Sequence, residues 1–216
     1  MGRIVGVFIV SYLLGSLPPG LLWGWIARKI DVRRHGSGRT GGTNVWRSAG
    51  FPAALLTAVF DALKGTAAVA LARWVGLSLW GEALAGTLAI VGHNYSIFLR
   101  FDGGAGTATS MGVTAALWLP SLPILLISGT AMGLLVGHAS VASIFVALML
   151  PVLHLLRGSL PQALGFGLPA MALTLWALRP NIVRLLNGEE RFLPIYQKQP
   201  PPIQLSHHHA NRKDTP

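Results

Sequence analysis

The stretch with the densest set of reactive and polar groups lies between residues 35 and 47. It reads His35-Gly-Ser-Gly-Arg-Thr-Gly-Gly-Thr-Asn44 and is followed by Arg47. Its glycines let backbone N–H groups approach a ligand closely, and such concave arrangements bind anions. Ser37 and Thr43 add hydroxyl donors, and the guanidinium groups of Arg39 and Arg47 suit bidentate contact with phosphate. We therefore predict a phosphate-binding loop, although the residue spacing of a P-loop is absent. The alternative is a plain linker between two helices.

A second glycine-rich stretch follows His93 and opens an apolar segment. It reads Phe101-Asp-Gly-Gly-Ala-Gly-Thr-Ala-Thr-Ser110. Free N–H groups and the positive end of the helix dipole meet at the start of a helix, which again favours an anion. We expect the N–H groups of residues 103–107 to contribute, which include those of Gly103, Gly104, Gly106 and Thr107. Two interpretations of His93 stay open: it acts as a base or ligand, or it is a hydrogen-bonded packing residue.

Further polar residues lie within or beside apolar segments. Asp61 and Lys64 are three residues apart, so they share a helix face. Because an unpaired charge is costly in lipid, we expect them to pair with each other or to face a polar interior. Ser140 opens another apolar segment, where a serine either caps the helix or binds a ligand. Asn181 lies in a basic segment that either contributes to a site or anchors the last helix.

The segments that must position these residues are those of a membrane protein. Hydrophobic residues make up 52% of the 216 positions and charged residues 11%, whereas soluble domains have about 25% charged residues. About 17 to 25 helical residues cross the hydrocarbon core. We predict an all-α protein with about seven transmembrane helices, at 4–26, 51–74, 82–99, 106–119, 121–137, 140–156 and 162–178.

The distribution of basic residues predicts the orientation of this domain. Of the 17 Lys and Arg residues, Arg3, Arg73 and Arg157 fall on one side of the predicted membrane, Lys64 falls within it, and the remainder fall on the other side. An excess of Lys and Arg marks cytoplasmic loops. We therefore expect the N-terminus outside, the C-terminus in the cytoplasm, and both glycine-rich loops on the cytoplasmic face.

The chain is predicted to divide into a transmembrane domain, residues 1–188, and a polar cytoplasmic tail, residues 189–216, that is mobile. Three adjacent histidines, 207–209, lie in this tail without a flanking carboxylate, so we expect no metal site. The sequence has no cysteine, so disulfides and thiolate chemistry are excluded. No soluble domain is predicted that could bind nucleic acid, and the first apolar stretch does not end like a cleavable signal peptide.

Taken in order, these motifs resemble the bacterial membrane glycerol-3-phosphate acyltransferases that use acyl-phosphate as donor. Ser37-Gly-Arg-Thr-Gly-Gly-Thr-Asn44 with Arg47 resembles the family's S-G-N-x-G-A-T-N-x-x-R, and Asp61-Ala-Leu-Lys64-Gly65 resembles D-x-x-K-G. Gly92-His93 with Phe101-Asp-Gly-Gly-Ala-Gly-Thr-Ala-Thr109 is similar to G-H…F-x-G-G-K-G-V-A-T, Gly137-His-Ala-Ser140-Val-Ala-Ser-Ile144 to G-Y-x-S-x-x-[AS]-I, and Asn181-Ile-Val-Arg184-Leu to N-I-x-R-L. The resemblance spans residues 11 to 190.

The resemblance implies a seven-helix protein of the bacterial inner membrane that takes part in phospholipid synthesis. An acyl chain would pass from acyl-phosphate to the 1-hydroxyl of glycerol-3-phosphate, giving lysophosphatidic acid without a covalent acyl-enzyme, a metal or a cofactor. Catalytic roles would fall to Ser37, His93 and Lys64. Substrate binding would fall to Arg39, Thr43, Asn44, Arg47, Gly103, Gly104, Gly106, Thr107, Ser140 and Asn181. The oligomeric state is left open.

The sequence departs from the family pattern at three positions of the expected site. Ala105 stands where the family has lysine, Leu178 where it has a phosphate-binding histidine, and Arg39 where it has asparagine. The expected function is therefore acyl transfer with a modified phosphate site. The alternatives are a catalytically weakened relative that acts as a membrane binding or assembly component, an enzyme with a different acceptor, and a transporter.

Overall fold

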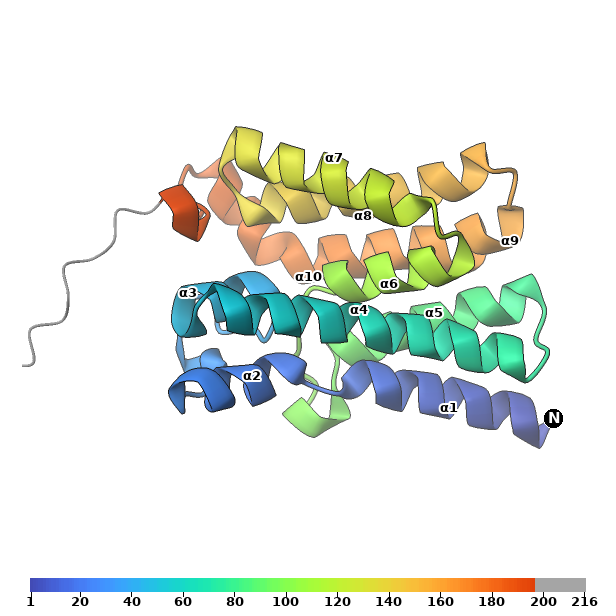
Figure 1. Cartoon of the computed structure of the whole chain (residues 1–216). Helices are drawn as coiled ribbons and strands as arrows, with labels where there is room; N and C mark the ends of the chain where they lie inside the picture. The colour runs from blue at the N-terminus through green and yellow to red at the C-terminus, as the bar shows by residue number, and fades with distance from the viewer. Residues whose placement is uncertain (197–216) are drawn as a thin grey trace, which may run out of the picture.

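The computed structural model describes residues 1–196 and, within them, an all-helical bundle without strands (Figure 1). Every stretch predicted to span the membrane contains a helix. The longer elements are α1 (Gly2–Ser16), α2 (Pro19–Arg28), α3 (Gly42–Ala49), α4 (Phe51–Trp74), α5 (Leu79–Asn94), α6 (Thr107–Leu117), α7 (Ser121–Val136), α8 (Ala139–Leu156) and α10 (Leu168–Leu186), and a short α9 (Leu160–Gln162) leads through a π-helical turn (Ala163–Gly167) into α10.

Four helical segments of the described residues are long and apolar enough to cross a bilayer: Gly2–Arg28, Phe51–Trp74, Ala139–Leu156 and Leu160–Leu186. Helix α7 is apolar but shorter. Helix α6 has only 11 residues, and at 1.5 Å per residue it is too short to cross a core of about 30 Å by itself. The number of seven spanning helices therefore stays a prediction.

Two of the predicted spans have different ends in the structure. The stretch expected at 4–26 is broken after Leu17, because Pro18 and Pro19 lack the N–H groups that would continue α1. The stretch expected to reach residue 99 leaves the α-helix at Asn94, and left-handed backbone at Arg100 and Phe101 then turns the chain back toward the bundle. At the first of these breaks, the carbonyl oxygen of Leu17 accepts a hydrogen bond from Lys64.

Close approaches at small residues hold the helices together. The position that a Cβ would take on Gly15 lies 2.0 Å from the carbonyl oxygen of Ala89, so α1 and α5 touch backbone to backbone. Gly112 on α6 makes the same kind of contact with Ala62 on α4, at 1.9 Å from the carbonyl oxygen. Small residues allow such packing between membrane helices, where lipid offers no hydrophobic driving force.

Replacing Gly15 by alanine is therefore expected to destabilise the bundle by about 1–3 kcal/mol, the usual cost of overpacking. The matched control is Gly6→Ala on the same helix, where nothing lies within 4 Å of the added Cβ. Thermal unfolding in detergent should show a lower Tm for Gly15→Ala and no loss for Gly6→Ala. Equal Tm values would mean that this backbone contact does not hold α1 in place.

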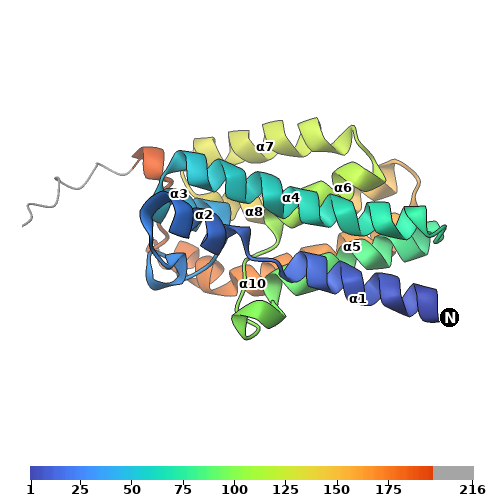
Figure 2. The same ribbon diagram turned by 60° about the horizontal axis from the view of Figure 1, so that its bottom comes forward.

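The bundle has two chemically different ends (Figures 1 and 2). The N-terminus and the connections after α4, α6 and α8 lie at one end, which carries Arg3, Arg73 and Arg157. Helices α2 and α3, the end of α10 and residues 189–196 lie at the other end, which we call the basic end because it carries Arg28, Arg47 and Arg184. Residues of both glycine-rich loops line one cavity, so the structure brings together the two loops that were expected to share a face.

The boundary between domain and tail also differs from the expectation. Residues 189–196 were assigned to the tail, but they fold back on the helices, with Glu190 and Leu193 buried. The hydroxyl of Tyr196 donates a hydrogen bond of 2.8 Å to the carbonyl oxygen of Leu134. The rest of the predicted tail, with its histidines 207–209, lies outside the described residues.

Candidate active site

A cavity of about 380 Å³ opens near the basic end of the bundle, between α3, α4, α6, α8 and α10. Its lining combines residues from every motif singled out in the sequence. Of the predicted site residues it includes Ser37, Arg39, Thr43, Asn44, Arg47, His93, Gly106, Thr107, Ser140 and Asn181. Lys64 does not line it, and Gly103 and Gly104 line a neighbouring cavity of about 180 Å³ instead.

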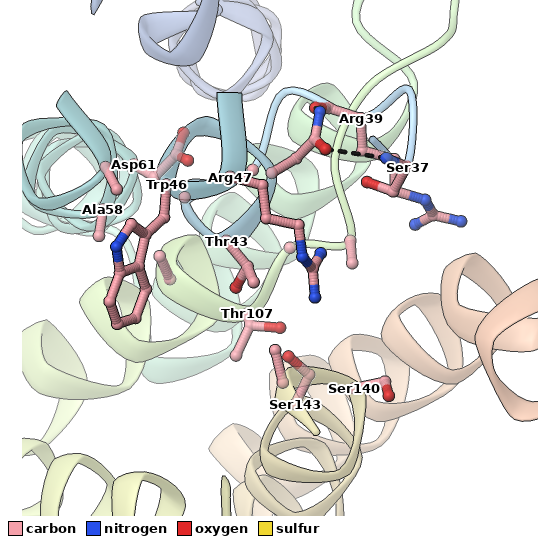
Figure 3. Close-up of a pocket in the computed structure, with 18 of the residues that line it drawn as sticks. Ser37, Arg39, Thr43, Trp46, Arg47, Ala58, Asp61, Thr107, Ser140 and Ser143 are labelled. Carbon is pink, nitrogen blue, oxygen red and sulfur yellow. Dashed lines mark hydrogen bonds between the residues drawn. The ribbon is translucent and has the colours of Figure 1, made fainter. Parts of the chain in front are cut away.

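Asn44 shapes the first glycine-rich loop from within. Its side-chain oxygen accepts the N–H of Ser37 at 2.8 Å (Figure 3). Its side-chain nitrogen contacts three carbonyl oxygens of the loop, those of Val32, His35 and Arg39, at 2.8 to 3.1 Å. With both ends of the amide engaged in the loop, Asn44 contributes to the site by fixing the positions of Ser37 and Arg39.

Three hydrogen-bond donors on three helices converge on the cavity without partners among the described residues. They are Nε of Arg47 on α3, the hydroxyl of Thr107 on α6 and the hydroxyl of Ser140 on α8. Figure 3 shows Arg47 extending from α3 toward Thr107 and Ser143. Buried polar groups are almost always hydrogen-bonded, and each unmade bond costs about 1–3 kcal/mol. Their convergence indicates a ligand with several acceptor oxygens.

Positive charge at the cavity comes from Arg47 and Arg39. Burial is the main cause that lowers the pKa of Arg47, and the neighbouring Arg191 adds to it; a guanidinium nevertheless stays charged in proteins. One amino group of Arg47 donates to the carbonyl oxygen of Phe192 at 3.1 Å. Partly buried charges are screened less by salt than exposed ones, so both guanidinium groups suit an anionic ligand.

The second glycine-rich loop is not the open anion nest that the sequence analysis predicted. The N–H groups of Gly103 and Gly104 donate to the carbonyl oxygens of Asn94 and His93, at 3.1 and 3.0 Å, and so are not available to a phosphate. A Cβ on Gly104 would lie 2.0 Å from Nε2 of His93. These two glycines instead let the loop pack against the histidine.

The end of this loop opens helix α6 at the cavity. Gly106, with φ of +89°, precedes Thr107, the first residue of α6. The first N–H groups of a helix have no intrahelical partner, and both residues line the cavity. The positive end of α6 therefore faces the same space as Arg47. The expected helix start at this loop is confirmed, and its binding of an anion stays a prediction.

Behind the cavity lies a buried ionic network. Nζ of Lys64 is 2.8 Å from Oδ1 of Asp61, as the i,i+3 spacing predicted, and Nδ1 of His93 is 3.3 Å from the same oxygen. Lys64 also donates to the carbonyl oxygen of Leu17, at the break between α1 and α2. Asp61 and His93 line the cavity, whereas Lys64 ties them to α1. Lys64 thus supports the site from outside the cavity.

Glu190 is a residue of the cavity that the sequence analysis did not assign to the site. Its two carboxylate oxygens accept hydrogen bonds from Nδ2 of Asn181, at 2.8 Å, and from Nε of Arg184, at 2.9 Å. The sequence offered one indication of its role. Only seven residues of the chain are acidic, and Glu190 follows the last basic motif.

The positions that depart from the family pattern all lie in this region. Ala105 and Leu178 line the cavity with uncharged surface. Arg39 lines both cavities, and its guanidinium donates to the carbonyl oxygen of Ala177, the neighbour of Leu178. The pKa of Arg39 is lowered, chiefly by burial. Within residues 1–196, no group of three or more His, Cys, Asp or Glu side chains could hold a metal ion.

Comparison with known proteins shows the class of protein to which this fold and site belong. Residues 5–188 match the family described as glycerol-3-phosphate acyltransferase. Glycerol-3-phosphate acyltransferase 1 of Deinococcus radiodurans is 45% identical over 188 residues, covering 86% of this chain and 93% of that protein. A glycerol-3-phosphate acyltransferase of Thermus thermophilus is 39% identical over 199 residues, covering 89% of this chain and 96% of that protein.

Solved structures agree with these relatives. The crystal structure of PlsY, an integral membrane glycerol 3-phosphate acyltransferase, in its glycerol 3-phosphate form superposes with a TM-score of 0.82 at 28% identity, covering 90% of this chain and 99% of that one. The chain therefore belongs to the glycerol-3-phosphate acyltransferase family and is an acyltransferase-type multi-pass membrane protein of phospholipid synthesis.

Proposed function

We propose that this protein transfers an acyl chain from acyl-phosphate to the 1-hydroxyl of glycerol-3-phosphate. The hydroxyl oxygen attacks the acyl carbon, and a new ester bond forms. The bond between the acyl carbon and the phosphate oxygen breaks, and its electron pair leaves with the phosphate. The products are lysophosphatidic acid and inorganic phosphate.

The observation that carries this proposal is the convergence of unpartnered donors on one cavity. Arg47, Thr107 and Ser140 present buried donors from three helices, and the N-terminus of α6 faces the same space. Both proposed substrates carry a phosphate, which offers the acceptor oxygens that these donors lack. An acyl-phosphate is already activated, so holding both substrates in line and stabilising developing negative charge would supply most of the rate enhancement.

The polar side chains predicted for the site have roles that follow from their places. Arg47, Arg39 and Asn181 bind phosphate oxygens, with hydroxyls from Ser37, Thr43, Thr107 and Ser140. We assign to His93 the proton of the acceptor hydroxyl: Asp61 faces its Nδ1, so Nε2, which packs against Gly104, is the nitrogen left to accept it. Lys64 holds Asp61 in this position. The proton then passes to the released phosphate, which closes the cycle.

The identity of the donor is tested by offering the purified protein glycerol-3-phosphate with either palmitoyl-phosphate or palmitoyl-CoA. We expect lysophosphatidic acid, detected by mass spectrometry, with the acyl-phosphate only. Binding of glycerol-3-phosphate without product from either donor would favour the weakened relative, in which Ala105 and Leu178 leave the phosphate site too weakly charged. If product forms only when another phosphorylated acceptor replaces glycerol-3-phosphate, that compound is the acceptor.

We further propose that the cavity faces the cytoplasm of a bacterial cell. The basic end of the bundle holds the cavity, and excess Lys and Arg mark cytoplasmic loops. A reporter fused after residue 40 should therefore report the cytoplasm, and one placed near residue 78 the outside. An outside signal from the fusion at residue 40 would reverse this orientation and move the site to the other face.

A further inference from the structure

A short segment after α10 contributes two residues, Glu190 and Leu193, to the lining of the cavity. We call residues 189–196 the C-terminal strap. Its backbone N–H at Leu193 donates to the carbonyl oxygen of Gly137 at 2.7 Å, in the turn between α7 and α8. The ring of Phe192 stacks on that of His138, with centroids 4.6 Å apart. The strap thus joins the end of α10 to the start of α8 across the basic end of the bundle.

Glu190 is the acidic residue by which the strap reaches the cavity. Its carboxylate side chain is only 5% exposed and accepts hydrogen bonds from Asn181 and Arg184. A buried carboxylate disfavours a second anion nearby, so a negative charge inside a phosphate-binding cavity works against substrate binding. We therefore expect this carboxylate to favour substrate binding in another way.

The chemistry of the carboxylate supplies that contribution. An ionised carboxylate accepts hydrogen bonds but donates none, so the amide of Asn181 must turn its nitrogen, not its oxygen, toward Glu190. The nitrogen carries a second N–H, which remains for another acceptor. Asn181 and Arg184 are three residues apart on α10 and share a face. One carboxylate therefore fixes the orientation of both side chains.

We propose that Glu190 is a positioning residue of the acyl transfer: it acts through Asn181, holding the amide so that it donates to the substrate phosphate. This inference rests on the proposed function, in which Asn181 binds a phosphate oxygen. Without the carboxylate, the amide is free to turn its oxygen toward the phosphate, and a donor becomes a repelling acceptor. The strap thereby determines how well the site binds phosphate.

The test is a double-mutant cycle of Glu190→Gln and Asn181→Ala, read in glycerol-3-phosphate affinity and in transfer rate. Glutamine keeps the size of the side chain and one acceptor but loses the charge that orients both partners. We expect Glu190→Gln to weaken glycerol-3-phosphate binding about 10-fold, the loss of one charge-assisted contact. In the Asn181→Ala background the same change should have little further effect, because the residue through which it acts is gone.

Two further variants separate positioning from a structural role of the strap. Tyr196→Phe removes the hydrogen bond to Leu134 at the far end of the strap, and it should leave glycerol-3-phosphate affinity unchanged. Glu190→Asp keeps the charge on a side chain one methylene shorter, and it should recover part of the affinity. Thermal unfolding of each variant reports any loss of fold.

Additive effects of Glu190→Gln and Asn181→Ala would overturn the proposal, as would an equal loss of affinity in Tyr196→Phe. Either result would make Glu190 a structural anchor of the strap. The proposed function is judged separately, by the transfer activity of the unaltered protein. If that protein binds glycerol-3-phosphate without transferring acyl groups, acyl transfer fails while the cycle still decides the role of Glu190 from the affinities.

Discussion

Arg47→Ala is expected to weaken glycerol-3-phosphate binding and acyl transfer by roughly 10- to 150-fold, since a charge-assisted hydrogen bond contributes about 1.5–3 kcal/mol. Arg47 reaches into the cavity from α3, and its Nε has no partner within the described residues. The guanidinium is partly buried, so water screens its attraction for a phosphate less than at an exposed site. Isothermal titration with glycerol-3-phosphate gives the affinity, and product formation gives the rate.

The control for this change is Arg47→Lys, which restores charge but not the planar fork that binds two oxygens. Partial recovery is therefore expected. Because Arg47 also donates to the carbonyl oxygen of Phe192, thermal unfolding must show that the alanine variant still folds. An unchanged affinity in a folded Arg47→Ala variant would place the phosphate site elsewhere.

The second large effect is expected at Arg39, because Ala105 is uncharged where the family pattern has a lysine. Arg39 and Ala105 line the same cavity although they come from different loops. We propose that Arg39 supplies the positive charge that a lysine supplies at position 105 in the family pattern. Arg39→Asn should then lower activity about 10-fold or more, although it restores the residue of that pattern. Adding Ala105→Lys should recover much of the loss.

A double-mutant cycle in transfer rate measures this compensation. The single variant Ala105→Lys is the matched control, because it adds a charge while Arg39 is still present and should change the rate less than it does in the Arg39→Asn background. Additive effects, or a fully active Arg39→Asn variant, would contradict compensation. Arg39 would then serve only to hold the loop against the carbonyl oxygen of Ala177.

Features with a short spacing in the sequence could be predicted well. The i,i+3 pair of Asp61 and Lys64 forms as expected, because helix geometry fixes which side chains meet. The first glycine-rich loop and the start of α6 meet at one cavity, as expected of loops that share a face. The composition likewise indicated helices in the long apolar stretches of the chain.

Features that depend on tertiary contacts could not be predicted in this way. The sequence cannot show that the N–H groups of Gly103 and Gly104 are taken by the carbonyl oxygens of Asn94 and His93. The sequence of a glycine-rich loop is the same whether its N–H groups face a ligand or a neighbouring backbone. Glu190 was missed because its role appears only when the strap folds back onto α10.

Acyl transfer by this protein requires that one cavity bring the two substrates together. The most direct test measures the release of inorganic phosphate from palmitoyl-phosphate by the purified protein, with and without glycerol-3-phosphate. Release that rises strongly with glycerol-3-phosphate, matched one for one by lysophosphatidic acid, is the predicted result. No release under either condition, or uptake of glycerol-3-phosphate into vesicles without release, would contradict acyl transfer by this protein.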